Sequence, residues 1–247
     1  ALGVNALGLA MLLLAAFLVP LVLLAGWGEI PAEHQALFTA LVLALEAFVV
    51  VIFSARDVFL FYVCFEAMLV PVYVLIGRFG GPDRQRAALK FLLYSLAGGL
   101  VMLVGVVALF FYGPRTETGY LIGSLAGSLS APPAAARWIF ASFMIAFAIK
   151  APLVPLHTWL PDAAEQATPG TSVLLIGVLD KIGTYGMIAL VLPLFPEAAA
   201  WAAPVVLVLA VVGIIYGGLA AIGQDSLYRL ISYTSISHFG FMVLGIF

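Results

Sequence analysis

Three ionisable side chains lie inside long apolar runs of this sequence, and their chemistry suits proton transfer. Glu66 lies in FLFYVCFEAMLVPVY, with no other charged residue between Asp57 and Arg78. Lys150 ends the run FMIAFAIK, and Lys181 lies near the middle of SVLLIGVLDKIGTYGMIALVL. Ionisable groups at membrane depth are costly and usually serve transport. We therefore predict a transport role for each. The alternatives are a protonated carboxyl bonded between helices for Glu66, a snorkelling lysine for Lys150 and a structural ion pair for Lys181.

Three further groups are candidates for the relay, and of these Glu46 and His157 are weaker than His238. Glu46, in ALVLALEAFVVVIF, serves either as a relay or as a structural bond to a partner helix. His238 follows a run of hydroxyls that could hold ordered water for proton hopping or could hold helices together. That run consists of Ser232, Tyr233, Thr234, Ser235 and Ser237. His157 precedes Trp159 at the cytoplasmic end of a predicted helix, where interface aromatics are common, so relay and structural roles are equally open.

Membrane-spanning helices must position these side chains, and the composition is typical of them. The chain has 247 residues, of which 65% are hydrophobic and 9% charged, whereas a soluble domain is about a quarter charged. Runs of roughly 20 apolar residues can span a bilayer. Eight candidate helices follow, at 6–27, 36–55, 58–77, 87–112, 138–156, 171–195, 201–223 and 228–247. We predict one all-α, polytopic transmembrane domain over residues 1–247, with the 78–90 loop on the cytoplasmic side because basic residues are more frequent there.

One predicted helix is irregular. The range 138–156 contains Pro152 and Pro155, and each proline removes a backbone donor and clashes with the preceding turn. We therefore predict a broken helix, which in transporters marks the ion path. A search for internal repeats finds only a short echo of the segment Lys90 to Tyr94 in Arg229 to Tyr233, too little to prove duplication.

Several functions are disfavoured by the residue types present. A single cysteine, Cys64, supports neither a disulfide framework nor a cysteine-ligated iron–sulfur cluster. The three histidines lack the spaced partners of a metal site, and no nucleotide-binding or nucleophile-elbow motif occurs, which leaves an intramembrane hydrolase as a distant alternative. A thinly spread net charge of -2 gives no reason to expect nucleic acid. Because the sequence starts at Ala1 and stops at Phe247 inside an apolar run, we expect a fragment.

Five motifs carry a resemblance to a known family. They are FEAMLVPVYVLIG, LKFLLYSLAGGLVML, FAIKAPLVPLHTWLPDA, GVLDKIGTYG and QDSLYRLISYTSISHFGF. In this order and spacing they resemble the antiporter-like membrane subunits of respiratory complex I, in particular the branch of chain M of bacterial NADH:quinone oxidoreductase and mitochondrial subunit 4. The resemblance implies an antiporter-like inverted-repeat fold of fourteen transmembrane helices, of which this segment would hold the third to the tenth.

The resemblance also implies a proton relay, carried by Glu46, Glu66, Lys150, Lys181 and His238. In that relay Glu66 and Lys150 would form a switchable ion pair, Lys181 would store the transported proton, and His238 with water would extend the path. Two positions depart from the family pattern. Asp180 stands where an apolar residue is expected, and Ala164 stands where a second histidine is frequent.

The expected setting is a multi-pass subunit of the bacterial inner membrane, beside other antiporter-like subunits of complex I and lipid. The resemblance places NADH, FMN, iron–sulfur clusters and quinone in partner subunits, with no cofactor in this chain. The alternatives are a subunit of a cation/proton antiporter or membrane hydrogenase, and a structural scaffold in which the charges only fix helix packing.

Overall fold

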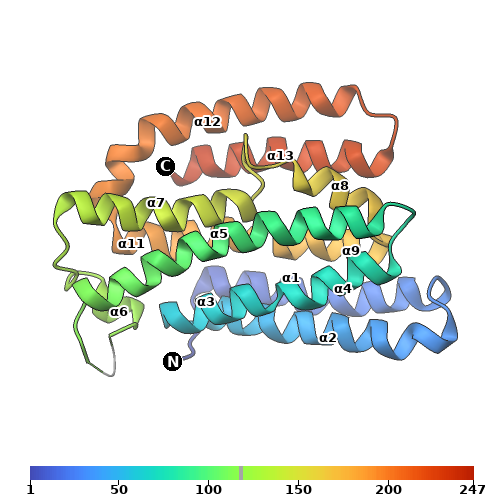
Figure 1. The fold of residues 1–247 in the computed structure, drawn as a ribbon, viewed down its shortest axis with the longest axis horizontal. Helices are drawn as coiled ribbons and strands as arrows, with labels where there is room; N and C mark the ends of the chain where they lie inside the picture. Colours follow the sequence, from blue (N-terminus) through green and yellow to red (C-terminus); the bar gives the residue numbers. More distant parts are fainter. Residues whose placement is uncertain (117–118) are drawn as a thin grey trace.

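Long helices lying side by side make up the computed structural model of the protein, which describes residues 1–116 and 119–247 (Figure 1). Seven helical segments in those residues are long and apolar enough to cross a membrane. They are α1 (Ala6–Ala25) with η1 (Gly26–Gly28), α2 (Ala32–Ser54), α3 (Val58–Ala67) with α4 (Leu69–Phe79), α5 (Arg84–Tyr112), α7 (Pro133–Lys150), the composite helix from α9 (Pro169–Leu174) to α11 (Leu192–Leu194), and α12 (Pro196–Ile222).

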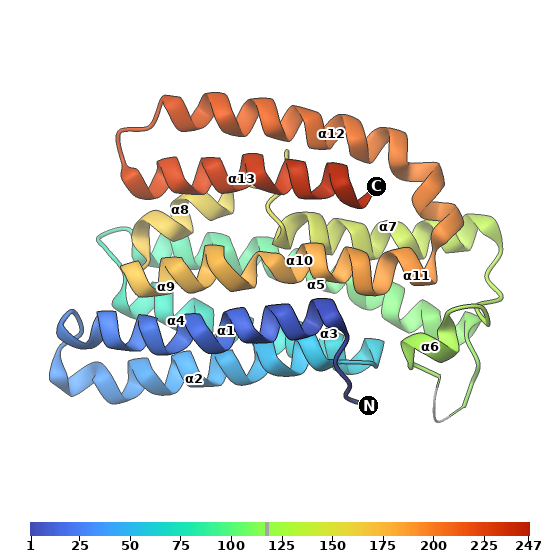
Figure 2. The same cartoon turned by 180° about the vertical axis from the view of Figure 1, so that it is seen from behind.

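An eighth long helix, α13 (Leu227–Ile246), packs along α12, and two short helices, α6 (Ile122–Leu125) and α8 (Trp159–Gln166), complete the described fold. Figures 1 and 2 show α12 and α13 along one edge, α1 and α2 along the opposite edge, and α5, α7 and the composite helix between them. The all-α polytopic fold of about eight helices is therefore confirmed. The central layer is the one that carries the predicted lysines.

The predicted helix over 138–156 was wrong at both ends. Helix α7 begins at Pro133, because proline suits the first turn of a helix, where its missing N–H would be unpaired anyway. It ends at Lys150, and residues 151–158 are not helical until α8 begins at Trp159. Pro152 and Pro155 both lie in this break, as their chemistry requires. The broken span therefore consists of α7, the break and α8.

Two further helices are irregular in ways that the sequence analysis did not predict. Helices α3 and α4 meet at a turn at Met68, because Pro71 has no N–H to donate to the carbonyl four residues earlier. The composite helix contains two π-helical turns, η2 (Leu175–Leu179) and η3 (Met187–Val191), on either side of α10 (Lys181–Gly186). In η2 the backbone N–H of Asp180 donates to the carbonyl of Leu175, five residues back. Such turns are frequent at functional sites.

Candidate functional site

The charged residues of the central helices lie at these irregularities. Glu66 is two residues before the turn at Met68, Lys150 is the last residue of α7, and Lys181 is the first residue of α10 after η2. Irregular backbone at membrane depth persists only where it is buried in protein or lines a water-filled cavity. Glu66, Lys150 and Lys181 therefore all lie beside irregular backbone, although they come from three separate spans.

Lys150 is enclosed by aromatic rings at the end of α7. It is 1% exposed, and its Nζ lies 5.2 Å from the centre of the Phe91 ring and 5.7 Å from that of Phe65. Nζ has no hydrogen-bond partner among the residues that the structure describes. Ring faces attract a cation but do not accept its protons as a carboxylate does. Lys150 is thus buried while its ammonium nitrogen has no hydrogen-bond partner among the described residues.

Glu66 approaches the same region from α3 and packs against α5. Its side chain lies over Gly99, where an added Cβ would overlap the carboxyl group. The Oε1 atom is buried without a hydrogen-bond partner in the described part of the chain. Glu66 and Lys150 interact electrostatically but form no salt bridge. The ion pair predicted from the resemblance is therefore open in this structure.

Asp180 also belongs to this group, although the residue pattern alone did not single it out. Asp180 is 0% exposed, and neither carboxyl oxygen has a hydrogen-bond partner within residues 1–116 and 119–247. Its charge interacts with those of Lys150 and Lys181. An aspartate inside an apolar run was itself the available signal, but comparison with the family pattern made it a departure rather than a candidate.

Lys181 and His238 face a common cleft between the composite helix and α13. Nζ of Lys181 donates a 3.2 Å hydrogen bond to the carbonyl oxygen of Ile176, which lies in η2. The cleft has a volume of about 570 Å³, and Thr234 and Ser235 also line it. His238 is exposed there. The structure thus brings Lys181 and His238 to one cleft, as a relay would require.

Three other hydroxyls of the run on α13 donate hydrogen bonds to backbone carbonyls. Ser232 donates to Tyr228 and Thr234 donates to Leu230, each one turn back on α13. Ser237 donates to the carbonyl of Ile214 on α12 and so joins the two helices. Of these three bonds only that of Ser237 joins two helices, whereas those of Ser232 and Thr234 stay within α13, and Ser235 lines the cleft.

His157 lies near the end of the break, two residues before α8 begins, and is packed inside the bundle. It is 4% exposed, its ring centre is 4.9 Å from that of Tyr216, and neither ring nitrogen has a hydrogen-bond partner among the described residues. Trp159 is fully buried and its indole N–H donates to the carbonyl of Ile149 across the break. The break turns both side chains into the bundle, and the relay role of His157 stays a prediction.

Glu46 lies apart from the other candidates. It is half-buried on α2 and faces a narrow space of about 10 Å³ lined by apolar side chains of α1, α2 and η2, including Val178 and Leu179. Glu46 forms no salt bridge with any described residue. Its surroundings give no support for a direct step with Lys150 or Lys181.

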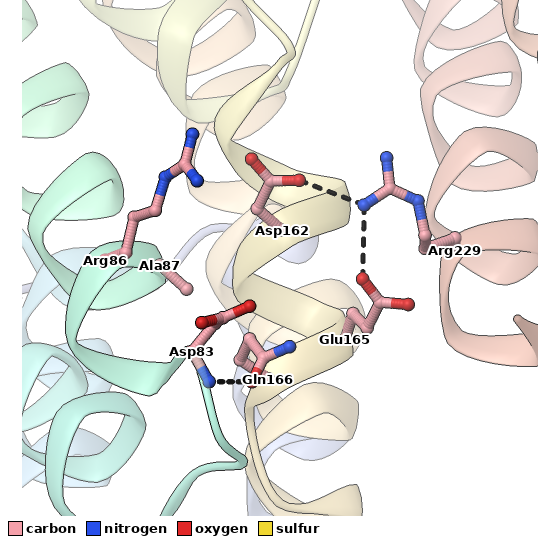
Figure 3. A pocket seen from close by; sticks show the side chains of 7 residues that line it. All are labelled: Asp83, Arg86, Ala87, Asp162, Glu165, Gln166 and Arg229. Carbon is pink, nitrogen blue, oxygen red and sulfur yellow. Dashed lines mark hydrogen bonds and ion pairs between the residues drawn. The ribbon is translucent and has the colours of Figure 1, made fainter.

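A network of charges holds the far end of the broken span. Asp162 on α8 accepts from Lys90 of α5 at 2.6 Å and from Arg229 of α13 at 3.0 Å, and Arg229 also reaches Glu165 at 3.2 Å. Figure 3 shows Asp162 and Glu165 turned toward Arg229 at the side of a 210 Å³ pocket. Burial raises the pKa of Asp162, but its hydrogen bonds with Lys90 and Arg229 outweigh burial and hold the pKa below its usual value.

The short sequence echo acquires a structural meaning in this network. Lys90 and Arg229 begin the two echoing segments, and they bind different oxygens of one carboxylate. The tyrosines that end the segments also face the broken span, because Tyr94 bonds the Thr158 hydroxyl at 2.8 Å and Tyr233 lies 6.4 Å from the ring of His157. The echo therefore describes two helices that hold the same element from two sides.

Comparison with known proteins identifies the relatives of this arrangement. The family described as NADH:quinone oxidoreductase/Mrp antiporter, TM, matches residues 55–247. NADH-quinone oxidoreductase subunit M of Mycobacterium tuberculosis is 44% identical over 281 aligned residues, which cover 100% of this chain and 51% of that protein. The chain therefore spans about half the length of the curated relatives it matches.

Solved structures share the fold. A chain of respiratory complex I from Thermus thermophilus with bound NADH superposes with a TM-score of 0.83 at 34% identity, covering 98% of this chain and 49% of that one. A chain of the Mrp complex from Dietzia sp. DQ12-45-1b superposes with a TM-score of 0.77 at 25% identity, covering 96% of this chain and 44% of that one. The helix arrangement is common to both kinds of complex.

Proposed function

Because the chain belongs to the NADH:quinone oxidoreductase/Mrp antiporter transmembrane family, we propose that it is the proton-translocating part of a membrane subunit of respiratory complex I. The localisation follows from the same relatives and from the membrane-length helices, and it is that of a multi-pass protein of the bacterial inner membrane. As a subunit it belongs to an enzyme complex, and we propose that NADH, FMN, iron–sulfur clusters and quinone are bound by partner subunits. Neighbouring antiporter-like subunits and lipid would surround it.

The single observation that carries this proposal is a pair of buried, opposite charges without hydrogen bonds. Glu66 Oε1 and Lys150 Nζ are both buried and unpartnered among the described residues, and they interact electrostatically without a salt bridge. A structural ion pair would be closed, since leaving either charge buried and unpaired is strongly destabilising. The open pair therefore favours a switch over a scaffold role.

The energy available from such a switch is sufficient for proton transfer. Two unit charges about 4 Å apart interact by ~4 kcal/mol at an effective dielectric constant of 20. Because ~1.36 kcal/mol corresponds to a tenfold change in a protonation equilibrium, closing or opening the pair changes the proton affinity of Lys150 about a thousandfold. Quinone reduction in partner subunits would drive the change, and Lys181 and His238 would pass the proton to the cleft.

The test is made in the full-length subunit within the assembled complex, reconstituted into liposomes. Glu66→Gln, Lys150→Ala and Lys181→Ala are each expected to assemble and to lose proton pumping, measured per NADH oxidised with a pH-sensitive dye. Glu197→Gln, an exposed glutamate in the first turn of α12, is the control. Unchanged pumping by Lys181→Ala would contradict the relay role of Lys181. Failure of the Glu66→Gln subunit to assemble would favour the alternative that the chain is a structural scaffold.

A second candidate is a cation/proton antiporter subunit, which the likeness to the Mrp complex chain supports. The same buried charges would then exchange a cation for protons without any redox reaction. Membrane vesicles containing the intact complex distinguish the two. Proton uptake driven by NADH supports the complex I proposal, whereas proton movement driven only by an imposed sodium gradient supports the antiporter.

A further inference from the structure

Asp180 is a buried carboxylate that the relay described so far leaves unused. It is fully buried at the junction of η2 and α10, and neither of its oxygens has a hydrogen-bond partner in the described residues. A buried carboxyl without hydrogen bonds is expensive unless cations lie near it or it takes up a proton. Both conditions are available here, because a lysine lies on either side.

The packing of α10 against α7 brings Asp180 to the break. One turn after Asp180 on the same helix, Gly183 lies against the backbone N–H of Ala151 and the carbonyl of Phe147, so closely that a Cβ at Gly183 would meet both. Residues three apart lie on the same face of a helix. Asp180 therefore projects from the face that contacts the end of α7, where Lys150 is the last residue.

Lys181 projects in another direction from the same helix. Successive residues of a helix point about 100° apart, and the Lys181 ammonium bonds to Ile176 and lines the cleft that holds His238. The four charged residues therefore interact in sequence, each with the next. Glu66 interacts with Lys150, Lys150 with Asp180, and Asp180 with Lys181. Charges of alternating sign thus run from α3 through α7 to α10.

We propose that Asp180 carries the transported proton between Lys150 and Lys181, an inference that rests on the proposed function. In the first step the side chains of Lys150 and Asp180 come within hydrogen-bonding distance, and the protonated Lys150 gives one proton to the carboxylate, which leaves a neutral amine and a neutral carboxyl group. In the second step the carboxyl gives that proton to the neutral amine of Lys181, which restores the carboxylate and leaves an ammonium. One N–H bond breaks and one forms overall, and no other reactant is needed.

The carboxylate has a physical advantage over direct transfer between the lysines. In a direct transfer, a single positive charge would move between two buried lysines with no counter-charge beside it, which is costly in the interior of a protein. An intervening aspartate is negative when Lys150 is charged and neutral once it holds the proton. The charges near Lys181 are therefore balanced at each stage of the transfer.

The experiment uses the full-length subunit in the assembled complex in liposomes. Asp180→Asn keeps the shape of the side chain but cannot take up and release a proton, so pumping per NADH oxidised is expected to fall about a hundredfold or more, in the range that positioned acid–base groups contribute. Asp180→Glu is expected to keep a substantial part of the pumping, because it retains a carboxyl. The matched control is Asp225→Asn, an exposed aspartate in the loop before α13.

The outcomes separate this inference from the proposed function. If Asp180→Asn assembles and pumps like the unchanged complex while Lys181→Ala does not pump, the relay stands and the role of Asp180 is overturned. If both variants pump normally, the proposed function is overturned. If Asp180→Asn does not assemble, Asp180→Glu decides: pumping together with a carboxyl C=O band that shifts in the infrared difference spectrum during turnover supports the inference, and lost pumping overturns it.

Discussion

The indole nitrogen of Trp159 donates a 2.9 Å hydrogen bond to the carbonyl oxygen of Ile149, one residue before the lysine that ends α7. This bond gives the Ile149 carbonyl a donor that the break would otherwise deny it, because Pro152 and Pro155 interrupt the series of helical backbone N–H groups. It also joins α8 directly to α7 across eight non-helical residues, Ala151 to Thr158. The position of Lys150 therefore depends on a side chain from the other half of its own span.

Trp159→Phe tests this bond. Phenylalanine fills much of the same apolar space but cannot donate, so the Ile149 carbonyl is left buried and unpaired at a cost of about 1–3 kcal/mol. We expect a lower Tm for the purified complex and less pumping per NADH. Trp27→Phe is the control, because Trp27 is 69% exposed. Equal Tm values for the two variants would show that the bond does not stabilise the break.

Gly99→Ala tests the packing of the Glu66 carboxyl group against Gly99. The new methyl group would overlap the carboxyl group, so Glu66 must change its rotamer or α3 must move away from α5. We expect assembly with reduced pumping. Gly218→Ala on α12 is a matched control, because a Cβ there meets no atom within 4 Å. A Gly99→Ala complex that pumps as well as the Gly218→Ala complex would mean that the position of Glu66 is not critical.

Lys181→Arg separates charge from proton transfer. Arginine keeps the positive charge and fits the 570 Å³ cleft, but a guanidinium does not release its proton in proteins. The variant should assemble normally and lose pumping, as judged by native gel electrophoresis and dye quenching. Arg115→Gln, at an exposed position outside the cleft, serves as the comparison. Pumping by Lys181→Arg at the normal rate would show that this residue contributes only charge.

Asp162→Asn tests the charge network through its pH dependence. The folded-state pKa of Asp162 is lowered from 3.8, so its contribution to stability is fully present above that value and is lost as pH falls through the lower folded-state pKa. Lys90 and Asp162 are about one third exposed, so the contribution at neutral pH is at most about 1 kcal/mol. The Tm difference between the unchanged complex and the variant should shrink as the pH falls below 3.8. A difference independent of pH would contradict this expectation.

Much of the fold could be predicted from the sequence because membrane helices depend on local composition. Each of the eight predicted ranges overlaps a helical segment of membrane-spanning length or α13, and the prolines at 152 and 155 correctly placed a break. The extent of the break was not predictable, since Trp159 ends it through a tertiary hydrogen bond. The π-helical turn η2 beside Asp180 was also missed, because no residue type in LLIGVL requires it.

The candidate site was only partly predictable. The cost of a buried charge singled out Glu66, Lys150 and Lys181 without any knowledge of their neighbours. Their order, however, came from the family resemblance, since Glu66 and Lys150 are distant in the chain. Asp180 was missed because its main partner, Lys150, comes from another span and is brought near only by the packing of Gly183 against Ala151.

The π-helical turn η2 also sets the angular phase of everything that follows it. A turn closed by a bond from residue 180 back to residue 175 contains one residue more than an α-helical turn, so the helix beyond it is rotated by about 100° relative to an uninterrupted one. Without that extra residue, Asp180 would take the angular position next to its present one and would turn away from α7. A shortening of η2 by one residue would therefore leave the composition almost unchanged and yet disconnect the two lysines.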